Sequence, residues 1–327
     1  MNSKYLQFKQ FLGDWYYPNY RYTQLLQAIF IQKIHRFEEM MILPLALRNK
    51  LITQFGESVC CLQPSCILSS KQVHKTLFAL SDGKSVETIH LQYQKGRNSF
   101  CISSQVGCGF KCSFCATGAV GFKRNLTVDG ITDQLLYLYL QGHRLDSIAF
   151  MGMGEPLANP YLFDALEVLT HPHLFALSQR RITLSTIGIV PKIYALTEQF
   201  PQVHLTFSLH SPFDEQRTVL MPVNEIFPLS EVMKALSHHV MYTGKKMYLA
   251  YILLRGVNDS LLHAQGIVDL LCQYVGQKKF LYHVDLISYN ETDKTSVQYE
   301  QSGKQYMHAF ILVLQKHDIV VTVRIQF

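Results

Sequence analysis

Three cysteines lie within eight residues of the stretch Gly107-Cys-Gly-Phe-Lys-Cys-Ser-Phe-Cys-Ala116, in the spacing C-x3-C-x2-C. Three thiolates on one short loop hold three corners of a [4Fe–4S] cluster and leave the fourth iron without a protein ligand. An iron with an open position binds a small molecule and passes it an electron. The spacing therefore predicts that Cys108, Cys112 and Cys115 bind such a cluster.

Other roles for these cysteines fit the sequence less well. A zinc site normally recruits a fourth cysteine or histidine at similarly tight spacing, and the intervening residues offer none. Disulfides are disfavoured because three is an odd number and the N-terminus has no signal-peptide core. Zinc or plain buried thiols remain the alternatives. We interpret Cys60, Cys61 and Cys66 as small apolar residues.

The bulk composition predicts a globular cytoplasmic protein. Of 327 residues, 48% are hydrophobic and 17% are charged, which suits a large core and excludes a disordered chain. No run approaches the roughly 18 apolar residues of a membrane span, so we expect a cytoplasmic protein with reduced thiols. The net charge of +6 favours a polyanionic partner without establishing one.

Three regions follow one another along the chain. Residues 1–75 are predicted to form a helical accessory domain, with Pro44 at the start of one helix. Residues 76–97 are predicted to form a β-hairpin extension, because the turn signal Ser81-Asp-Gly-Lys84 separates two strand-like runs. Residues 98–327 alternate between strand-like and helix-like segments.

The second strand of the hairpin contains an unexpected carboxylate. Alternation from Val86 onward puts Glu87 on the same face as Ile89 and Leu91. A charge among apolar residues is costly unless it is paired or used chemically. A functional role for Glu87 would explain this position, and a salt bridge at the strand end would explain it too.

The third region predicts an α/β fold. Strand-like runs occur at 100–104, 147–151, 182–186, 203–208, 247–253, 282–287 and 319–325, and helix-like segments at about 129–142, 161–170, 191–199, 230–241, 260–275 and 299–316. This alternation favours a parallel sheet with right-handed crossovers, either a barrel or an open sheet. In a β/α barrel, chemistry gathers at the carboxyl ends of the strands. The distinctive polar residues fall there, namely the cysteine loop, Gly152-Met-Gly-Glu-Pro156, Ser185-Thr-Ile-Gly188, Ser208-Leu-His-Ser211 and Asn290.

Several longer motifs are specific to one family. The chain resembles the RlmN/Cfr family of radical S-adenosylmethionine (SAM) 23S rRNA adenine methyltransferases in Cys101–Gly118, Gly121-Phe-Lys-Arg-Asn-Leu126, Met151–Asn159 and Ser185–Pro191. The resemblance extends to Phe327, and Leu220-Met-Pro-Val-Asn224 is closer to the Cfr branch. It implies a partial (β/α)6-type radical SAM barrel over residues 98–327, with the helical accessory domain and hairpin extension before it.

The resemblance also implies roles for single residues. Cys108, Cys112 and Cys115 would bind the cluster, Glu87 would accept a proton, and Cys101 would help to resolve a covalent protein–RNA intermediate. The N-terminal helices would contact RNA, with Lys123 and Arg124 near the RNA entrance. The residues that match SAM-binding positions are Gly154, Glu155, Ser185, Ser208, Leu209, His210 and Asn290.

The family's chemistry requires a [4Fe–4S] cluster and SAM as cofactors. Carbons C2 and C8 of adenine are poor nucleophiles, so one SAM methylates a cysteine near the C-terminus and a second is cleaved to a radical that activates this methyl group. Cfr-type enzymes methylate C8 of the adenosine conventionally numbered 2503 in 23S rRNA, which gives resistance to antibiotics of the peptidyl-transferase centre. The implied partners are protein-free 23S rRNA, or an early assembly intermediate, and an electron donor such as a flavodoxin or ferredoxin. We expect a monomer that does not bind a membrane.

One family feature is missing from this sequence. The family continues after the final strand with a segment containing Ala-Ala-Cys-Gly-Gln-Leu, whose cysteine carries the methyl group, whereas this sequence ends at Phe327 and its last cysteine is Cys272. We expect Cys272 to lie on an outer helix, where it is a poor substitute. We interpret the sequence as truncated, with a natural inactive variant as the alternative. The 327-residue form is then expected to cleave SAM without methylating RNA.

Three other functions are possible. Within the family, the alternative is C2 methylation of adenine in 23S rRNA, with tRNA as a further substrate. A non-catalytic RNA-binding relative agrees with the missing carrier cysteine but not with the intact cluster motif and Glu87. A radical SAM enzyme acting on a protein or a small molecule is disfavoured by the N-terminal helices and the Gly121–Leu126 motif.

Overall fold

The computed structural model describes residues 3–292, 295 and 297–324. The chain divides into two compact units, each built from segments that are distant in the sequence. Unit 1 comprises residues 1–106, 124–153 and 159–182, and unit 2 comprises residues 107–123, 154–158 and 183–327. In the described part of the chain, no helix is both long and apolar enough to cross a membrane.

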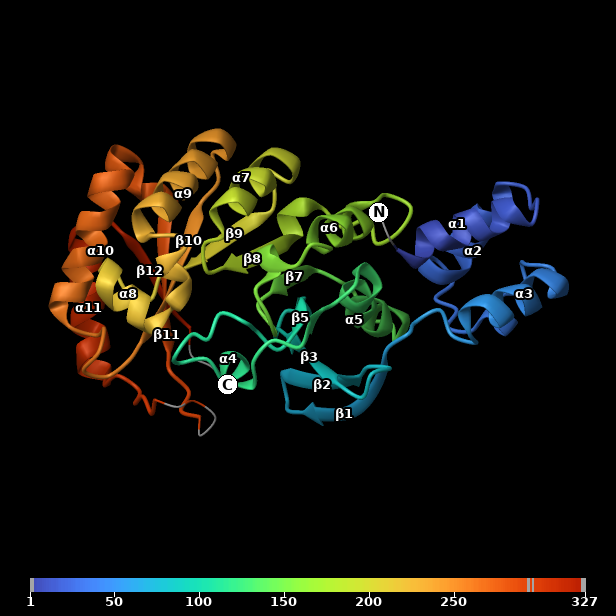
Figure 1. The fold of residues 1–327 in the computed structure, drawn as a ribbon, viewed down its shortest axis with the longest axis horizontal. Helices are drawn as coiled ribbons and strands as arrows, with labels where there is room; N and C mark the ends of the chain where they lie inside the picture. Colours follow the sequence, from blue (N-terminus) through green and yellow to red (C-terminus); the bar gives the residue numbers. More distant parts are fainter. Residues whose placement is uncertain (1–2, 293–294, 296, 325–327) are drawn as a thin grey trace. The chain divides into compact units, whose positions relative to one another are not determined.

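Unit 1 begins with three helices, α1 (Lys4–Asp14), α2 (Tyr20–Phe30) and α3 (Leu45–Phe55) (Figure 1). Leu25, Leu26 and Ile29 of α2 recur at helical spacing and are buried. Pro44 directly precedes α3, as the sequence predicts, because the first turn of a helix does not need the N–H group that proline lacks.

The strands of unit 1 lie in the order β1-β2-β3-β4-β7. Their bounds are β1 (Gln63–Ser69), β2 (Val73–Ala79), β3 (Ser85–Gln92), β4 (Asn98–Cys101) and β7 (Ser147–Phe150). Strands β1 to β4 pair antiparallel, whereas β4 and β7 are parallel. The expected hairpin is present as β2 and β3.

Residues 63–69 form strand β1, although the sequence predicts that they belong to a helical domain. Residues 63–69 contain no strong strand signal of their own, but they pair along the length of β2. Strand β1 is an edge strand, and Pro64 near its start is tolerated there because an edge residue need not donate to the sheet. Pairing with the hairpin therefore overrides the local pattern.

Helices α5 (Val128–Leu140) and α6 (Leu162–Thr170) complete unit 1. The Thr127 hydroxyl caps α5 by accepting a hydrogen bond from the backbone N–H of Gly130 at 3.1 Å. Further along α5, the Gln134 amide accepts from the N–H of Ser103 at 2.9 Å and donates to its carbonyl at 2.8 Å. The same amide accepts from the Thr88 hydroxyl at 2.8 Å. Gln134 thus ties α5 to β3 and to the segment that follows β4.

Two short strands, β5 (Gln105–Val106) and β6 (Arg124–Asn125), pair antiparallel on either side of residues 107–123. Within that segment the backbone approaches itself closely. Gly107 has a φ of +76°, and a Cβ atom there would lie 1.8 Å from the carbonyl oxygen of Gly121. Only glycine fits at this position.

Unit 2 contains parallel strands in the order β8-β9-β10-β11-β12. Their bounds are β8 (Ile182–Thr186), β9 (His204–Ser208), β10 (Met247–Leu253), β11 (Tyr282–Ser288) and β12 (Val320–Arg324). Every strand expected in this part of the sequence is present. The last was expected to reach residue 325, which lies outside the described residues.

Helices connect these strands and lie outside them (Figure 1). They are α7 (Val190–Gln199), the short α8 (Asp214–Leu220), α9 (Leu229–Thr243), α10 (Leu261–Tyr274) and α11 (Lys304–Lys316), while α4 (Ala116–Val120) follows the cysteine loop. Gly244, with a φ of +65°, ends α9 in the left-handed conformation. The strand–helix alternation confirms the predicted α/β class.

A buried ion pair joins α1 to α5 in unit 1. The Lys4 ammonium donates to Asp133 and, at 2.8 Å, to the carbonyl of Val59. The second oxygen of Asp133 accepts from the N–H of Cys61 at 2.8 Å. Both charged side chains are nearly inaccessible, at 6% and 0% exposed. Burial alone would lower the pKa of Lys4, but Asp133 and other nearby groups raise it, so Lys4 stays charged.

Replacing Asp133 with alanine is expected to destabilise unit 1 by about 3–5 kcal/mol, because the Lys4 ammonium would stay buried without its counterion. Urea unfolding followed by the fluorescence of Trp15, the single tryptophan, measures the loss. The matched control is Glu57→Ala, which removes the exposed Arg36–Glu57 pair of 2.8 Å and should cost at most about 1 kcal/mol. Equal losses in the two variants would contradict this prediction.

Candidate cluster and cofactor site

The three cysteines of the motif lie on one loop between β5 and α4, where they are half-buried free thiols. Ser113 fixes the loop through both its backbone and its side chain. Its N–H donates to the carbonyl of Leu220 at 2.9 Å, and its hydroxyl lies 2.8 Å from that of Tyr299. The Phe114 ring meets the His210 ring edge-on at a centroid distance of 4.8 Å.

The electrostatics of the loop suit a cationic ligand. Burial raises the pKa of the Cys108 thiol to about 11 and that of the Cys112 thiol still further, and each also feels the charge of Cys115. A positive charge beside Cys108 and Cys112 would favour the ionised form of these two thiols. The irons of a [4Fe–4S] cluster supply that charge and favour sulfur ligands, so the donor set fits this cofactor.

A single metal ion fits the described residues less well. Among them, no three histidine, cysteine, aspartate or glutamate side chains come together as ligands of one ion. A zinc site needs its ligands around a single centre. In a cubane cluster each thiolate binds a different iron, so the sulfur atoms need not converge on one point.

Glu155 follows the motif Gly152-Met-Gly and is buried, with 3% of its surface exposed. One carboxylate oxygen accepts from the Thr186 hydroxyl at 2.7 Å and from the N–H of Leu157 at 3.1 Å. The other accepts from the N–H of Ile187 at 2.9 Å. Burial raises the pKa of Glu155 to about 7 although these hydrogen bonds oppose the shift. The carboxylate therefore holds the end of β8 against residues 154–158.

The other candidate cofactor residues follow the strand ends of unit 2. Ser185 lies within β8 opposite Thr206, and Ser208 ends β9 opposite Ala250. Leu209 and His210 come directly after β9, and Asn290 comes after β11. Because neighbouring parallel strands end at the same edge of a sheet, these residues line one edge. This confirms the expected location at the carboxyl ends.

His210 has an unusual backbone and a fixed tautomer. Its φ of +54° lies in the left-handed region, which a non-glycine residue rarely adopts. Its Nδ1 accepts from the N–H of Ile252 at 3.0 Å, and the Asn258 amide donates to its carbonyl at 2.7 Å. Burial lowers the pKa of His210 to about 3. The ring is therefore neutral, with its proton on Nε2.

Glu87 and Cys101 lie on the adjacent strands β3 and β4 of unit 1. Glu87 forms an ion pair of 2.8 Å with Lys75 of β2, so the salt-bridge interpretation of this carboxylate is confirmed. Burial raises the pKa of the Cys101 thiol to about 12, and the Glu87 carboxylate contributes in the same direction. Cys101 is therefore a thiol rather than a thiolate at neutral pH.

The remaining predicted residues are distributed over both units. Arg124 forms an ion pair of 2.7 Å with Asp82 in the hairpin turn, and Lys123 belongs to unit 2. Cys272 is exposed on α10, an outer helix, as expected. Sequence reasoning missed Arg217, a fully buried arginine on α8. Its only sequence signal is its position one turn before Leu220 on the apolar side of that helix.

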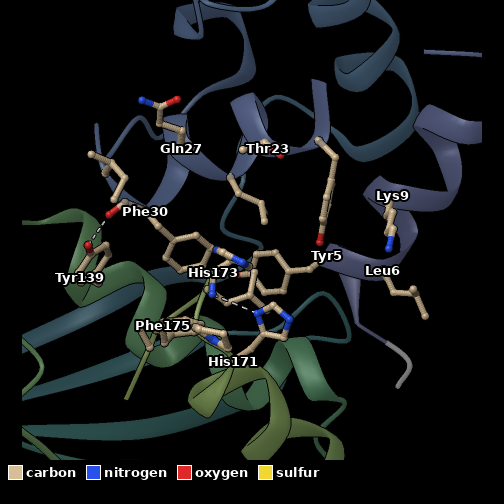
Figure 2. Close-up of a pocket in the computed structure, with 16 residues that line it drawn as sticks. Tyr5, Leu6, Lys9, Thr23, Gln27, Phe30, Tyr139, His171, His173 and Phe175 are labelled. Carbon is tan, nitrogen blue, oxygen red and sulfur yellow. Dashed lines mark hydrogen bonds between the residues drawn. The ribbon is translucent and has the colours of Figure 1, made fainter. Parts of the chain in front are cut away.

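A cavity of about 720 Å³ lies within unit 1, and none of the predicted site residues lines it (Figure 2). Helices α1 and α2 and the segment 171–176 supply most of its walls. Its aromatic and basic lining residues are Tyr5, Lys9, Tyr22, Phe30, Tyr139, His171, His173 and Phe175. Phe30 and Phe175 meet edge-on at 5.2 Å. The lining contains no carboxylate among the described residues.

Comparisons with known proteins agree with this site. Residues 102–264 match the model of the radical SAM superfamily. The ribosomal RNA large subunit methyltransferase Cfr of Lachnoclostridium phytofermentans is 57% identical over 99% of this chain and 94% of its own length. The protein of that name from Staphylococcus aureus is 51% identical over 99% of this chain and 93% of its own.

A solved structure supports the same assignment. The crystal structure of a radical SAM methyltransferase from Sphaerobacter thermophilus is 33% identical and matches with a TM-score of 0.90, covering 98% of this chain and 93% of that one. It confirms the expected α/β radical SAM methyltransferase fold. The cysteine loop, the strand-end residues and these near-complete matches together show that the chain belongs to the RlmN/Cfr family of the radical SAM superfamily.

Proposed function

We propose that this chain belongs to a radical SAM methyltransferase that modifies C8 of the family's target adenine in 23S rRNA and thereby gives resistance to peptidyl-transferase-centre antibiotics. The observation that carries the proposal is the link between the cysteine loop and the strand ends. Ser113 bonds to Leu220, and Phe114 contacts His210 directly after β9. A cluster ligated by the loop and a SAM molecule bound by the strand ends would therefore be neighbours.

Each cofactor has its own set of side chains. Cys108, Cys112 and Cys115 would ligate the cluster, which supplies the electron for the reductive cleavage of SAM. Glu155 would order the backbone around the SAM amine, because its carboxylate accepts hydrogen bonds from the Thr186 hydroxyl and from the N–H groups of Leu157 and Ile187.

The remaining SAM contacts follow from the sheet edge. The left-handed backbone at Gly154, with a φ of +97°, lets a ligand approach the chain closely. Ser185, Ser208 and Asn290 offer hydroxyl and amide groups for the polar parts of SAM, and Leu209 and His210 form the wall beside them. The neutral His210 ring would add no charge next to the SAM sulfonium.

Glu87 and Cys101 are proposed as the proton acceptor and the resolving thiol. Their strands are adjacent, and the Cys101 thiol would have to lose its proton before it could act as a nucleophile. The ion pair with Lys75 uses one of the two oxygens of Glu87, and a carboxylate is a side chain that can accept a proton in catalysis.

The helical accessory domain of residues 1–75 is proposed to contact the RNA. Support comes from the unit 1 cavity, which combines aromatic rings with Lys9 and two histidines and contains no carboxylate among the residues that the structure describes (Figure 2). Stacking on aromatic rings beside a cation is how proteins hold an unpaired nucleotide. The occupant we propose is one unpaired nucleotide of the RNA substrate. The protein would act as a cytoplasmic monomer with a flavodoxin or ferredoxin as electron donor.

Cys112→Ala is expected to abolish reductive SAM cleavage, because a cluster with one protein ligand fewer is not held at the loop. The measurement is the yield of 5′-deoxyadenosine after anaerobic reconstitution with iron, sulfide and dithionite. Cys272→Ala, which removes an exposed thiol on α10, should retain at least about half of the activity. Cleavage that survives in Cys112→Ala would contradict the assignment.

The position of the methyl group is predicted to be C8. The complete gene that encodes residues 1–327 would be expressed in a host that lacks its own enzyme for this adenine, and the rRNA nucleosides analysed by mass spectrometry. We expect 8-methyladenosine together with growth in the presence of peptidyl-transferase-centre antibiotics. Finding 2-methyladenosine alone would instead support the C2-specific alternative.

Binding of a 23S rRNA fragment is predicted to use the unit 1 cavity. His173→Ala should weaken RNA binding about tenfold, because a stacking contact is lost. Lys9→Ala should lower the slope of log K against log salt concentration by about one, because one phosphate contact is lost. Fluorescence anisotropy at several salt concentrations measures both. The matched controls are His308→Ala and Lys304→Ala on α11, which are exposed and lie outside unit 1. If the cavity variants bind like these controls, the RNA is held elsewhere.

A further inference from the structure

Arg217 of α8 is a buried cation in unit 2. Its side chain is 0% exposed, and its hydrogen bonds go to uncharged oxygen atoms. Burying a guanidinium is costly unless its N–H groups find acceptors. Burial lowers the pKa of Arg217 to about 10, which is still well above neutrality, so the group keeps its charge. Because burying this charge has a high desolvation cost, a role for Arg217 is expected in the contacts that it makes possible.

The guanidinium joins the ends of two strands. Its Nη2 donates to the carbonyl of Ile187 at 2.8 Å and to that of Ser208 at 3.1 Å. Its Nε donates to the carbonyl of Leu209 at 3.2 Å. Ile187 directly follows β8, Ser208 is the last residue of β9 and Leu209 directly follows it. Ser208 and Leu209 are also candidates for SAM binding. The group thus sets the spacing between the two strand ends.

The same helix also reaches the cysteine loop. The carbonyl of Leu220, at the end of α8, accepts from the N–H of Ser113 at 2.9 Å and from its hydroxyl at 3.3 Å. Cys112 lies next to Ser113, and Arg217 precedes Leu220 by one turn of α8, so its charge lies on the helix that holds the cysteine loop.

The position of Arg217 is itself fixed. Its Nη1 donates to the side-chain oxygen of Asn224 at 2.6 Å. The amide nitrogen of Asn224 donates in turn to the Asp214 carboxylate at 3.0 Å and to the Thr218 hydroxyl at 2.9 Å. The Phe207 ring centroid lies 4.9 Å from the guanidinium carbon. Contacts on its face and its edge leave the guanidinium little freedom to reorient.

We propose that Arg217 is a positioning residue that holds the SAM-binding strand ends in register with the cluster loop and raises the reduction potential of the cluster by its charge. This inference rests on the proposed cluster and SAM site. A lysine could not replace it fully, because the acceptors lie in several directions that the planar fork of an arginine matches and a single ammonium does not. The charge and the hydrogen bonds are therefore separable by mutation.

The test compares Arg217→Lys, which keeps the charge and loses the fork, with Arg217→Met, which loses both. Arg255→Met is the control, because Arg255 is an exposed arginine of unit 2 that pairs with Glu300. Each protein is reconstituted, and its iron content, melting temperature, SAM dissociation constant and cluster reduction potential are measured. The potential is the readout that a purely structural role would leave unchanged.

Both Arg217 variants are expected to bind SAM about tenfold more weakly than wild type. Only Arg217→Met should show a more negative potential, since a lost positive charge destabilises the reduced cluster. If Arg217→Met takes up no iron, the proposal requires that Arg217→Lys keep the wild-type potential while it loses SAM affinity.

Wild-type SAM affinity in both variants, or an unshifted potential in an iron-loaded Arg217→Met, overturns the proposal. So does a shift in potential with Arg217→Lys or Arg255→Met. Failure of the proposed cluster and SAM site is distinguishable, because then the wild-type protein itself would assemble no cluster and bind no SAM.

Discussion

At the carboxyl ends of β8 and β9, several backbone N–H and carbonyl groups have no partner in a neighbouring strand. The arrangement of unit 2 at this edge follows from the side-chain hydrogen bonds that these groups make instead. A buried amide or carbonyl without a partner costs about 1–3 kcal/mol. Glu155 accepts from the N–H of Ile187, and Arg217 donates to the carbonyls of Ile187, Ser208 and Leu209. The Glu155 carboxylate and the Arg217 guanidinium thereby stabilise an irregular sheet edge where a cofactor can approach the backbone.

The secondary structure of the second half could be predicted from the sequence because its signals are local. Runs such as Met247–Leu253 and Tyr282–Ser288 are rich in β-forming residues, and most of their residues are buried, as in strands covered on both faces. In the helices between them, apolar residues recur with the helical period of about 3.6 residues instead of the strand period of two. Parallel strands then require the polar residues after β8, β9 and β11 to meet at one edge. For this reason the strand pattern alone was enough to locate the candidate cofactor site.

Interactions between distant residues could not be predicted in this way. Lys4 and Asp133 are 129 residues apart, and nothing near either residue identifies its partner. Arg217 resembles a surface arginine in the sequence, since its acceptors are carbonyl groups that any residue provides. Strand β1 depends on an edge that exists only once the hairpin has formed. Glu87 could be singled out because strand alternation places this carboxylate beside apolar residues, whereas its partner Lys75 lies outside the predicted hairpin of residues 76–97.

The pairing of β5 with β6 has a consequence for how the cluster is acquired. These strands close residues 107–123 into a loop at its base, and the contact of Gly107 with Gly121 narrows the loop just above. Bringing the ends of a free segment together has an entropic cost that grows with its length. The fold of the chain itself meets that cost at the base of the loop, so a group bound by the three cysteines would need to order only its tip.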